Sequence, residues 1–541
     1  MTLLPIAGRE MRVAARRTGL YRQRFIAAIT ATILFGFFYI IGQRESVAPS
    51  ALSQRFFYTV SLAAFLYALT AGVHLTSDSL SQEVREGTLG LLFLTPLRGY
   101  DIVLGKLAAS SLSAAYGMVA MLPILAVPLL MGGVSGATFG QVALLLLATL
   151  FFSLSFGMLV SAWCRVERRA ASGALAGVLF IGGGWPILLM WAAESMPGVA
   201  FDDFWPLMLP SPGFAFAYAF RSGMQSAAVP VQFFMSVAAI LGSGTLFLAL
   251  ASHRIPRSFQ ERPEGGIVQR WRAVLRRWSL GPAEGRVRQR RRWLDIHPIL
   301  WLQERHRWPC VIPWLVLGLL ALGYLAGFAQ WGEDWLSYPV CVLAVLALHA
   351  TLKIQVANAA GHGFTDARHS GLLALVLGTP LSVSEIVGGH RRALRRQFDR
   401  VAALVFALDI VFMVIALEDA GVTWNQGDWW DSFAPFLVAI VLLPIDYLVL
   451  VRVGLWQSLI RKSGVQAARW TIFLILVMPW AAFGAAMAIW GTTALSRNLP
   501  NLEQPHQAAW VWAGIGIAID LYFGLQAACR LPDEIRSRAS G

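Results

Sequence analysis

Charged residues and cysteines are both scarce in this sequence. Only 14% of its 541 residues are charged and 57% are hydrophobic, whereas about a quarter of a soluble globular chain is charged. The four cysteines form no C-x-x-C pair and lie in or beside apolar runs, so we expect neither disulfides nor a metal site. The sequence also lacks the G-x-x-x-x-G-K-[ST] phosphate loop and the H-E-x-x-H zinc motif. We therefore expect neither an enzyme nor a self-contained ATPase.

Long apolar runs recur along the whole chain. A bilayer core requires roughly 20 apolar residues per helical crossing, and we predict about twelve such crossings on that criterion. In the first half they are 25–42, 56–76, 104–132, 142–164, 170–193 and 232–252; in the second half they are 310–330, 338–360, 398–417, 433–453, 470–493 and 507–529. The runs predict an all-α, multi-pass integral membrane protein.

The net charge of +14 is concentrated in particular loops. Residues 253–297 hold twelve arginines against four acidic residues, and residues 391–396 hold four more arginines. The intervening loops are instead acidic, for example at Glu333 and Asp334. Because cation-rich loops stay in the cytoplasm, we expect a cell (inner) membrane location with both termini cytoplasmic. Lipid headgroups explain these arginines, and we expect no nucleic acid partner.

Two segments of the chain resemble each other. Residues 87–106 and 371–390 are identical at nine of twenty positions, without gaps, at an offset of 284. Each copy falls between the second and third predicted crossings of its half. We therefore predict two parallel six-helix repeats, residues 1–252 and 298–541, joined by a basic cytoplasmic linker at 253–297. Parallel repeats of this kind place a transport pathway at their interface.

Three further segments have an unusual character. Amphipathic stretches at residues 3–17 and 267–278 carry arginines on one side and apolar residues on the other, which is typical of helices lying in the membrane interface. The proline-rich segment 194–231 is too long for a turn and too interrupted for a straight helix. Re-entrant or interfacial helices would fit that segment.

Ionisable residues interrupt the predicted crossings of the second half. A charge near the bilayer centre costs roughly 2.5–3.5 kcal/mol on insertion scales, so these side chains should face the helix bundle. They either line a polar pathway or form buried pairs, such as one between Lys353 and an aspartate, and the sequence leaves both interpretations open. The residues concerned are Asp409, Asp446, Asp520 and Lys353.

The segment before and within the first repeat copy resembles the signature of ABC-2 type transporter permeases, E-x-x-x-G-T-L-x-x-L-x-x-T-P. The second copy keeps the glycine and the T-P pair but replaces the glutamate and the first threonine. In the first copy the motif and its neighbouring charges are Glu83, Arg85, Glu86, Gly87, Thr88, Thr95 and Pro96; in the second they are Asp366, Arg368, Gly371, Thr379 and Pro380.

The resemblance implies the membrane-spanning subunit of an ABC transporter, with export as the expected direction. Residues 78–97 and 362–381 would be coupling segments that dock on separate ATPase subunits, in two copies, which bind ATP and Mg. Because the second copy has fewer of the motif's charges, we expect it to bind its ATPase more weakly. Two alternatives are a secondary transporter that uses the membrane aspartates and a membrane scaffold that transports nothing.

Overall fold

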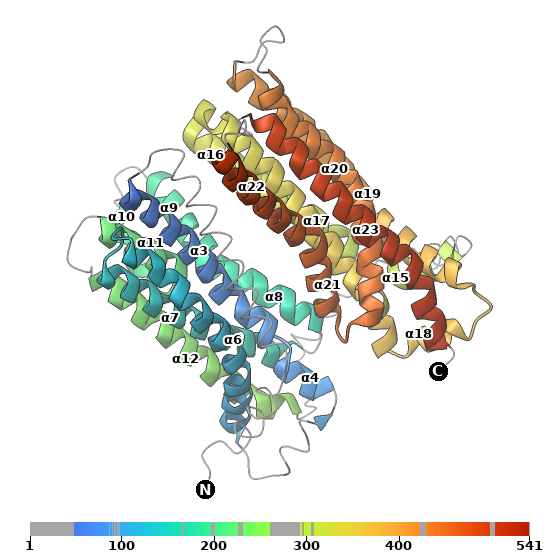
Figure 1. Ribbon diagram of the computed structural model, residues 1–541. Helices are drawn as coiled ribbons and strands as arrows, with labels where there is room; N and C mark the ends of the chain where they lie inside the picture. The colour runs from blue at the N-terminus through green and yellow to red at the C-terminus, as the bar shows by residue number, and fades with distance from the viewer. Residues whose placement is uncertain are drawn as a thin grey trace. The chain divides into compact units, whose positions relative to one another are not determined.

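The structure is a computed structural model, and every regular element in its described part is a helix (Figure 1). It describes residues 48–85, 87–88, 90, 94, 98–164, 167–195, 201–224, 231–259, 293–294, 297–304, 308–421, 429–497 and 504–539. Within these ranges, 10 helices are long and apolar enough to cross a membrane. The chain is therefore an all-α integral membrane protein, as its composition predicts.

The predicted crossings can be compared with these helices one by one. Ten of the predicted segments correspond to the 10 helices, and an eleventh, 56–76, lies in helix α3, Pro49–Leu75. The predicted crossing 25–42 lies outside the described residues, as do both amphipathic interfacial segments.

The chain divides into two compact units, Met1–Arg262 and Pro263–Gly541. In the first unit, helix α12 continues to Phe259, past the predicted boundary at 252. The segment 194–231 contains the short helices α10 and α11. The elements of this unit after α3 are α4 (Ser79–Arg85), α6 (Gly99–Leu130), α7 (Gly136–Trp163), α8 (Glu167–Leu179), η1 (Phe180–Gly184), α9 (Trp185–Ser195), α10 (Phe201–Met208), α11 (Pro212–Met224) and α12 (Val231–Phe259).

The second unit contains longer helices. Its elements are α15 (Pro298–Glu304), α16 (Trp308–Trp331), η2 (Gly332–Leu336), α17 (Tyr338–His369), α18 (Leu372–Leu377), α19 (Val383–Asp419), α20 (Trp429–Ile460), α21 (Gly464–Ile472), η3 (Phe473–Val477), α22 (Met478–Arg497) and α23 (Pro505–Ala539).

One helix lies at the centre of each unit. In the most apolar stretch of α7, 72% of the residues are buried, and in that of α20, 67%. In the other eight spans the share of buried residues does not exceed 44%. In the first unit α7 packs against α3, α6, α11 and α12, and in the second α20 packs against α17, α19, α21 and α23. A helix that is apolar all round is buried, and α7 has no charged residue. Both central helices are the fourth predicted crossing of their half.

The fifth crossing of each unit contains a π-helical segment. In the first unit η1 joins α8 to α9, and in the second η3 joins α21 to α22. In both cases the next helix has proline at its second position, Pro186 or Pro479. Proline has no N–H to donate to the preceding turn, and π-helices are rare. The two units therefore interrupt the corresponding crossing in the same way.

Candidate functional site

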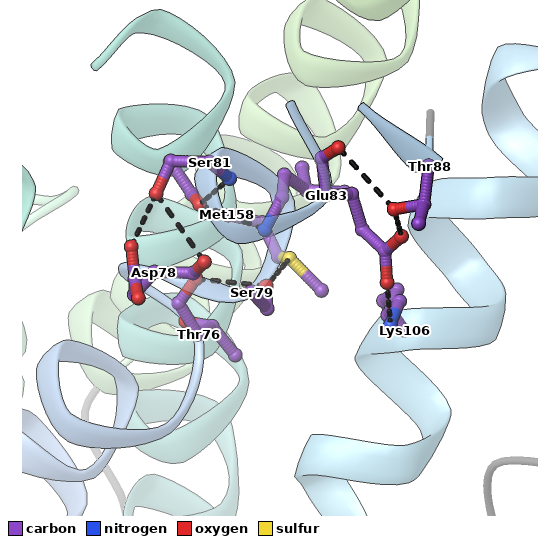
Figure 2. A network of polar contacts seen from close by, with 10 residues as sticks. Thr76, Asp78, Ser79, Ser81, Glu83, Thr88, Lys106 and Met158 are labelled. Atoms are coloured by element: carbon purple, nitrogen blue, oxygen red, sulfur yellow. Dashed lines mark hydrogen bonds and ion pairs between the residues drawn. The ribbon is translucent and has the colours of Figure 1, made fainter. Parts of the chain in front are cut away.

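The first coupling segment begins with a tight turn that separates α3 from α4. The Thr76 hydroxyl lies 2.7 Å from the carbonyl oxygen of Gly72 and 2.9 Å from that of Leu154 in α7. The carboxylate of Asp78, two residues after Thr76, accepts a hydrogen bond from the Ser81 hydroxyl (Figure 2). Serine, threonine and aspartate interrupt helices in this manner because their side chains compete for local backbone groups. The turn re-aims the chain, so α4 starts as a separate helix.

The start of α4 is held by the central helix α7. The backbone N–H groups of Leu80 and Ser81 donate to the Ser161 hydroxyl oxygen at 3.0 and 3.1 Å. N–H groups in the first turn of a helix have no partner within it, so Ser161 serves as a cap supplied from another helix. The Ser79 hydroxyl adds a contact to the Met158 sulfur at 3.2 Å. The first coupling segment is thus attached directly to the most buried helix of its unit.

Glu83 is paired within the unit rather than being free for a partner. Its carboxylate accepts from Lys106 Nζ in α6 at 2.6 Å and also from the Thr88 hydroxyl (Figure 2). Arg85 is the last residue of α4. Gly87 follows with φ of +71°, a left-handed conformation that other residues adopt only at a cost. Three further motif residues, Glu86, Thr95 and Pro96, lie outside the described residues.

The second coupling segment has a different helical structure, because α17 continues without a break to His369. The segment 362–381 therefore consists of the end of α17, the short α18 and the residues after it. The turn-forming Thr76-Ser77-Asp78-Ser79 of the first copy is replaced by Ala360-Gly361-His362-Gly363, which removes the side chains that hydrogen-bond to the local backbone. Gly371 again has a left-handed backbone, with φ of +70°. Beyond α18, Thr379 donates to the Val376 carbonyl oxygen at 2.6 Å, and Pro380 follows.

The second segment is nevertheless attached to its central helix at the corresponding place. The Phe364 N–H donates to the Ser458 hydroxyl of α20 at 3.3 Å, and the Thr365 hydroxyl donates to the Ser458 carbonyl oxygen at 2.8 Å. Arg368 donates to the Leu459 carbonyl oxygen at 2.8 Å and also to that of Arg461. A cation is favourable at the carbonyl end of a helix. Arg368 thus closes the end of α20, whereas the Asp366 side chain is 67% exposed.

The attachments in the two units involve matching positions. Leu80 and Phe364 are related by the repeat offset of 284, and Ser161 and Ser458 by an offset of 297. Four residues before each serine, Gly157 and Gly454 approach the second crossing so closely that a Cβ would lie 2.1 Å from Thr76 Oγ1 or 2.5 Å from Ala360 Cβ. A shared G-x-x-x-S spacing could have indicated this contact, but glycine and serine are too common for the pattern to stand out.

The ionisable residues of the second half are buried together. Lys353 forms an ion pair with Asp446, and His349 Nε2 lies 2.8 Å from an oxygen of Asp409. Asp520 is only 1% exposed and lies beside Asp446. No group of three or more His, Cys, Asp or Glu residues in the described part of the chain is arranged to hold a metal ion.

Comparison with known proteins identifies the first unit. Residues 15–262 match the family model described as ABC-2 family transporter protein, a range that includes the first coupling segment and the central helix α7. No curated protein shows significant sequence similarity to the chain. The first unit is thus similar to ABC-2 family transporter proteins over residues 15–262, and the chain as a whole is a multi-pass membrane protein.

Proposed function

We propose that the chain is the membrane-spanning subunit of an ATP-driven transporter, built from two fused permease units that work with two copies of a separate ABC-type ATPase. The observation that carries the proposal is the matched attachment of each coupling segment, Leu80 to Ser161 and Phe364 to Ser458. ATP and Mg would bind to the partner. The second unit lies beyond the family match, and its matching contacts are what supports treating it as a second permease unit.

The attachment provides a mechanical route from the ATPase to the helix bundle. Each segment contacts the most buried helix of its unit, so a push on the segment would move α7 or α20 rather than a peripheral helix. Packed helices move as rigid elements and transmit displacements. A left-handed glycine follows the helix of each coupling segment, Gly87 after α4 and Gly371 after α17, and lets the chain reverse direction there.

Exposed leucines support docking of these segments in a groove of a partner. Leu94 in the first segment is 82% exposed and Leu375 in the second is 72% exposed. Apolar side chains that protrude from a charged loop are typical anchors at protein interfaces. We assign polar contact with the ATPase to the motif charges Arg85 and Glu86, and to Asp366, whose side chain lies 3.3 Å from His362 Nδ1 but is 67% exposed.

Photo-crosslinking tests the docking directly. A photoreactive amino acid at Leu94 or Leu375 should crosslink to a co-expressed ABC-type ATPase, and the ATPase should co-purify and be stimulated by the chain. The matched control is Leu319, which is 71% exposed but lies in the crossing helix α16, where only lipid should be labelled. Crosslinking at Leu319 alone, or ATPase activity indifferent to the chain, would refute the proposal.

We further propose export across the inner membrane, with both termini and both coupling segments in the cytoplasm. The alternation of cation-rich and acidic loops supports this orientation. ATP-dependent accumulation in inverted membrane vesicles that contain both proteins is the expected result. Transport driven by an ion gradient without ATP would favour a secondary transporter instead.

A further inference from the structure

Five ionisable side chains meet inside the second unit, and we refer to them as the ionisable cluster. Its members are His349, Lys353, Asp409, Asp446 and Asp520, and each is at most 9% exposed. They are supplied by α17, α19, α20 and α23. Lys353 lies halfway along α17 and Asp446 halfway along α20. The cluster is therefore far from either end of these helices.

The first unit shows that this fold does not require such charges. At the same offsets of 284 and 297, the first unit has apolar or neutral residues, and no Asp or Glu occurs in any predicted crossing of the first half. The matching residues are also buried, so the same places in the bundle are filled without charge. The residues that match His349, Lys353, Asp409 and Asp446 are Phe65, Leu69, Leu125 and Thr149. Packing alone thus does not explain the ionisable cluster.

The contacts within the cluster leave one carboxyl group without a partner. Asp446 pairs with Lys353 and Asp409 with His349, but neither oxygen of Asp520 has a hydrogen-bond partner among the described residues. A buried carboxylate without donors is strongly unfavourable. A protonated carboxyl group gains an O–H donor, and the Asp446 carboxylate beside it is an acceptor. One proton would therefore satisfy a contact that the two ionised groups could not make.

We propose that Asp446 and Asp520 form a proton-binding site, in which one proton is shared between the two carboxyl groups and Lys353 neutralises the remaining negative charge. On uptake, a proton from water bonds to a carboxylate oxygen of Asp520 and the new O–H donates to Asp446. On release that O–H bond breaks, the proton returns to water, the hydrogen bond to Asp446 is lost, and no other covalent bond changes. A metal cation fits less well, because the Lys353 ammonium group already lies against Asp446. The site does not depend on a partner ATPase.

The surroundings of Asp520 contain few other titratable groups. Of the elements packed against α23, η3 has none and α22 has only Arg497 at its last position. On α20 the charged residues besides Asp446 are Asp431 near its start and Arg452 in its second half. On α19 Asp409 is paired with His349, and Asp399 and Arg400 lie at the middle of the helix. Asp399 accepts a hydrogen bond from Tyr447 of α20 at 2.7 Å. Lys353 itself lies on the same unbroken helix as Arg368, so its position would follow any movement of the second coupling segment.

Infrared spectroscopy of the purified chain, without any ATPase, tests the site. We expect a carbonyl band of a protonated carboxyl group at neutral pH that shifts in D₂O and is lost in Asp520→Asn. The control is Asp533→Asn on the same helix, because the Asp533 side chain is 77% exposed and its removal should leave the band unchanged. Absence of the band, or its persistence in Asp520→Asn, would overturn the proposal.

Thermal unfolding as a function of pH gives an independent measure. If the folded state holds a proton that unfolded aspartate has released, the folded state binds more protons than the unfolded state, and stability must fall as pH rises above neutral. Asp520→Asn should abolish this loss. An unchanged loss in the variant would overturn the proposal. So would stabilisation of the wild type at high pH by Na⁺ or K⁺, because a metal cation would then be the ligand.

Carbodiimide labelling tests the proton-binding site in the wild-type chain, so it applies even if Asp520→Asn does not fold. The reagent modifies protonated carboxyl groups, so in the wild-type chain the Asp520 peptide should be labelled at neutral pH, whereas Asp533 should be labelled only in acid. Labelling of Asp520 should decline as pH rises. Labelling that follows the pH profile of Asp533 would contradict the proposal.

Discussion

The backbone N–H of Leu80 donates a hydrogen bond to the Ser161 hydroxyl oxygen at 3.0 Å, and the same oxygen accepts from the Ser81 N–H at 3.1 Å. A hydrogen bond contributes about 0.5–1.5 kcal/mol net, so Ser161→Ala should lower the free energy of unfolding by roughly 1–3 kcal/mol. Ser458→Ala should cost less, since its hydroxyl accepts from one N–H, that of Phe364. Thermal unfolding of the purified chain measures both effects.

Ser155→Ala is the matched control for these variants. It lies on α7 as well, but its hydroxyl donates to the Phe151 carbonyl oxygen of the same helix. Ser161→Ala should also reduce stimulation of the ATPase, because α4 would lose two of its hydrogen bonds to α7. Equal stability and equal ATPase stimulation in the two alanine variants would contradict the proposed attachment.

The contact between Gly454 and Ala360 predicts a rescue experiment. A Cβ added at Gly454 would lie 2.5 Å from Ala360 Cβ, so Gly454→Ala should destabilise the second unit by about 1–3 kcal/mol through overpacking. The double variant Gly454→Ala with Ala360→Gly exchanges the two side chains and should recover most of the loss. The measurement is again thermal unfolding, and a double variant no more stable than Gly454→Ala would refute this packing.

Much of the fold follows from the sequence, because crossing a bilayer dictates helix length and apolarity. The runs 142–164 and 433–453 mark the central helices α7 and α20, and the repeat places the two coupling segments. What the sequence did not reveal depends on contacts between distant segments. The capping role of Ser161 is one example. Another is the contact of Arg368 with carbonyl groups at the end of α20, which its place in the repeat does not indicate. Residue type indicates charge, but only the folded chain decides which neighbour that charge meets.

The left-handed glycines Gly87 and Gly371 should tolerate asparagine better than valine. No atom of the described residues lies within 4 Å of an added Cβ at either glycine, so we expect the effect to come from the backbone. A left-handed conformation costs an ordinary L-residue roughly 1–2 kcal/mol, whereas asparagine adopts it more readily. Gly371→Val should therefore reduce ATPase stimulation and Gly371→Asn should largely retain it. Similar losses in both variants would point to a requirement other than backbone conformation.

Charge reversal should affect the two coupling segments differently. Glu86→Lys should reduce ATPase stimulation while leaving thermal stability unchanged, because we assign Glu86 to contact with the partner. Arg368→Glu should lower thermal stability, since a carboxylate would face the carbonyl groups of Leu459 and Arg461 at the negative end of a helix. The two effects are separated by ATPase assays at a temperature at which both variants are folded. If both variants then lose the same amount of stimulation, the prediction that the two segments bind their ATPases with different strength is wrong.

The ion pair between Lys353 and Asp446 predicts how the stability changes when both residues are replaced by their counterparts from the first unit. Removing one member of a buried ion pair leaves an uncompensated charge and costs about 3–5 kcal/mol, so Lys353→Leu alone should strongly lower the unfolding temperature. Lys353→Leu with Asp446→Thr introduces the residues that the first unit has at Leu69 and Thr149. With Asp520 holding a proton, no buried charge remains in that part of the cluster, and the double variant should be more stable than the single one.

Lys106→Leu is the control, because its ion pair with Glu83 is more exposed and its loss should cost less. A double variant as unstable as Lys353→Leu alone would mean that a negative charge persists in the cluster, which contradicts a protonated Asp520.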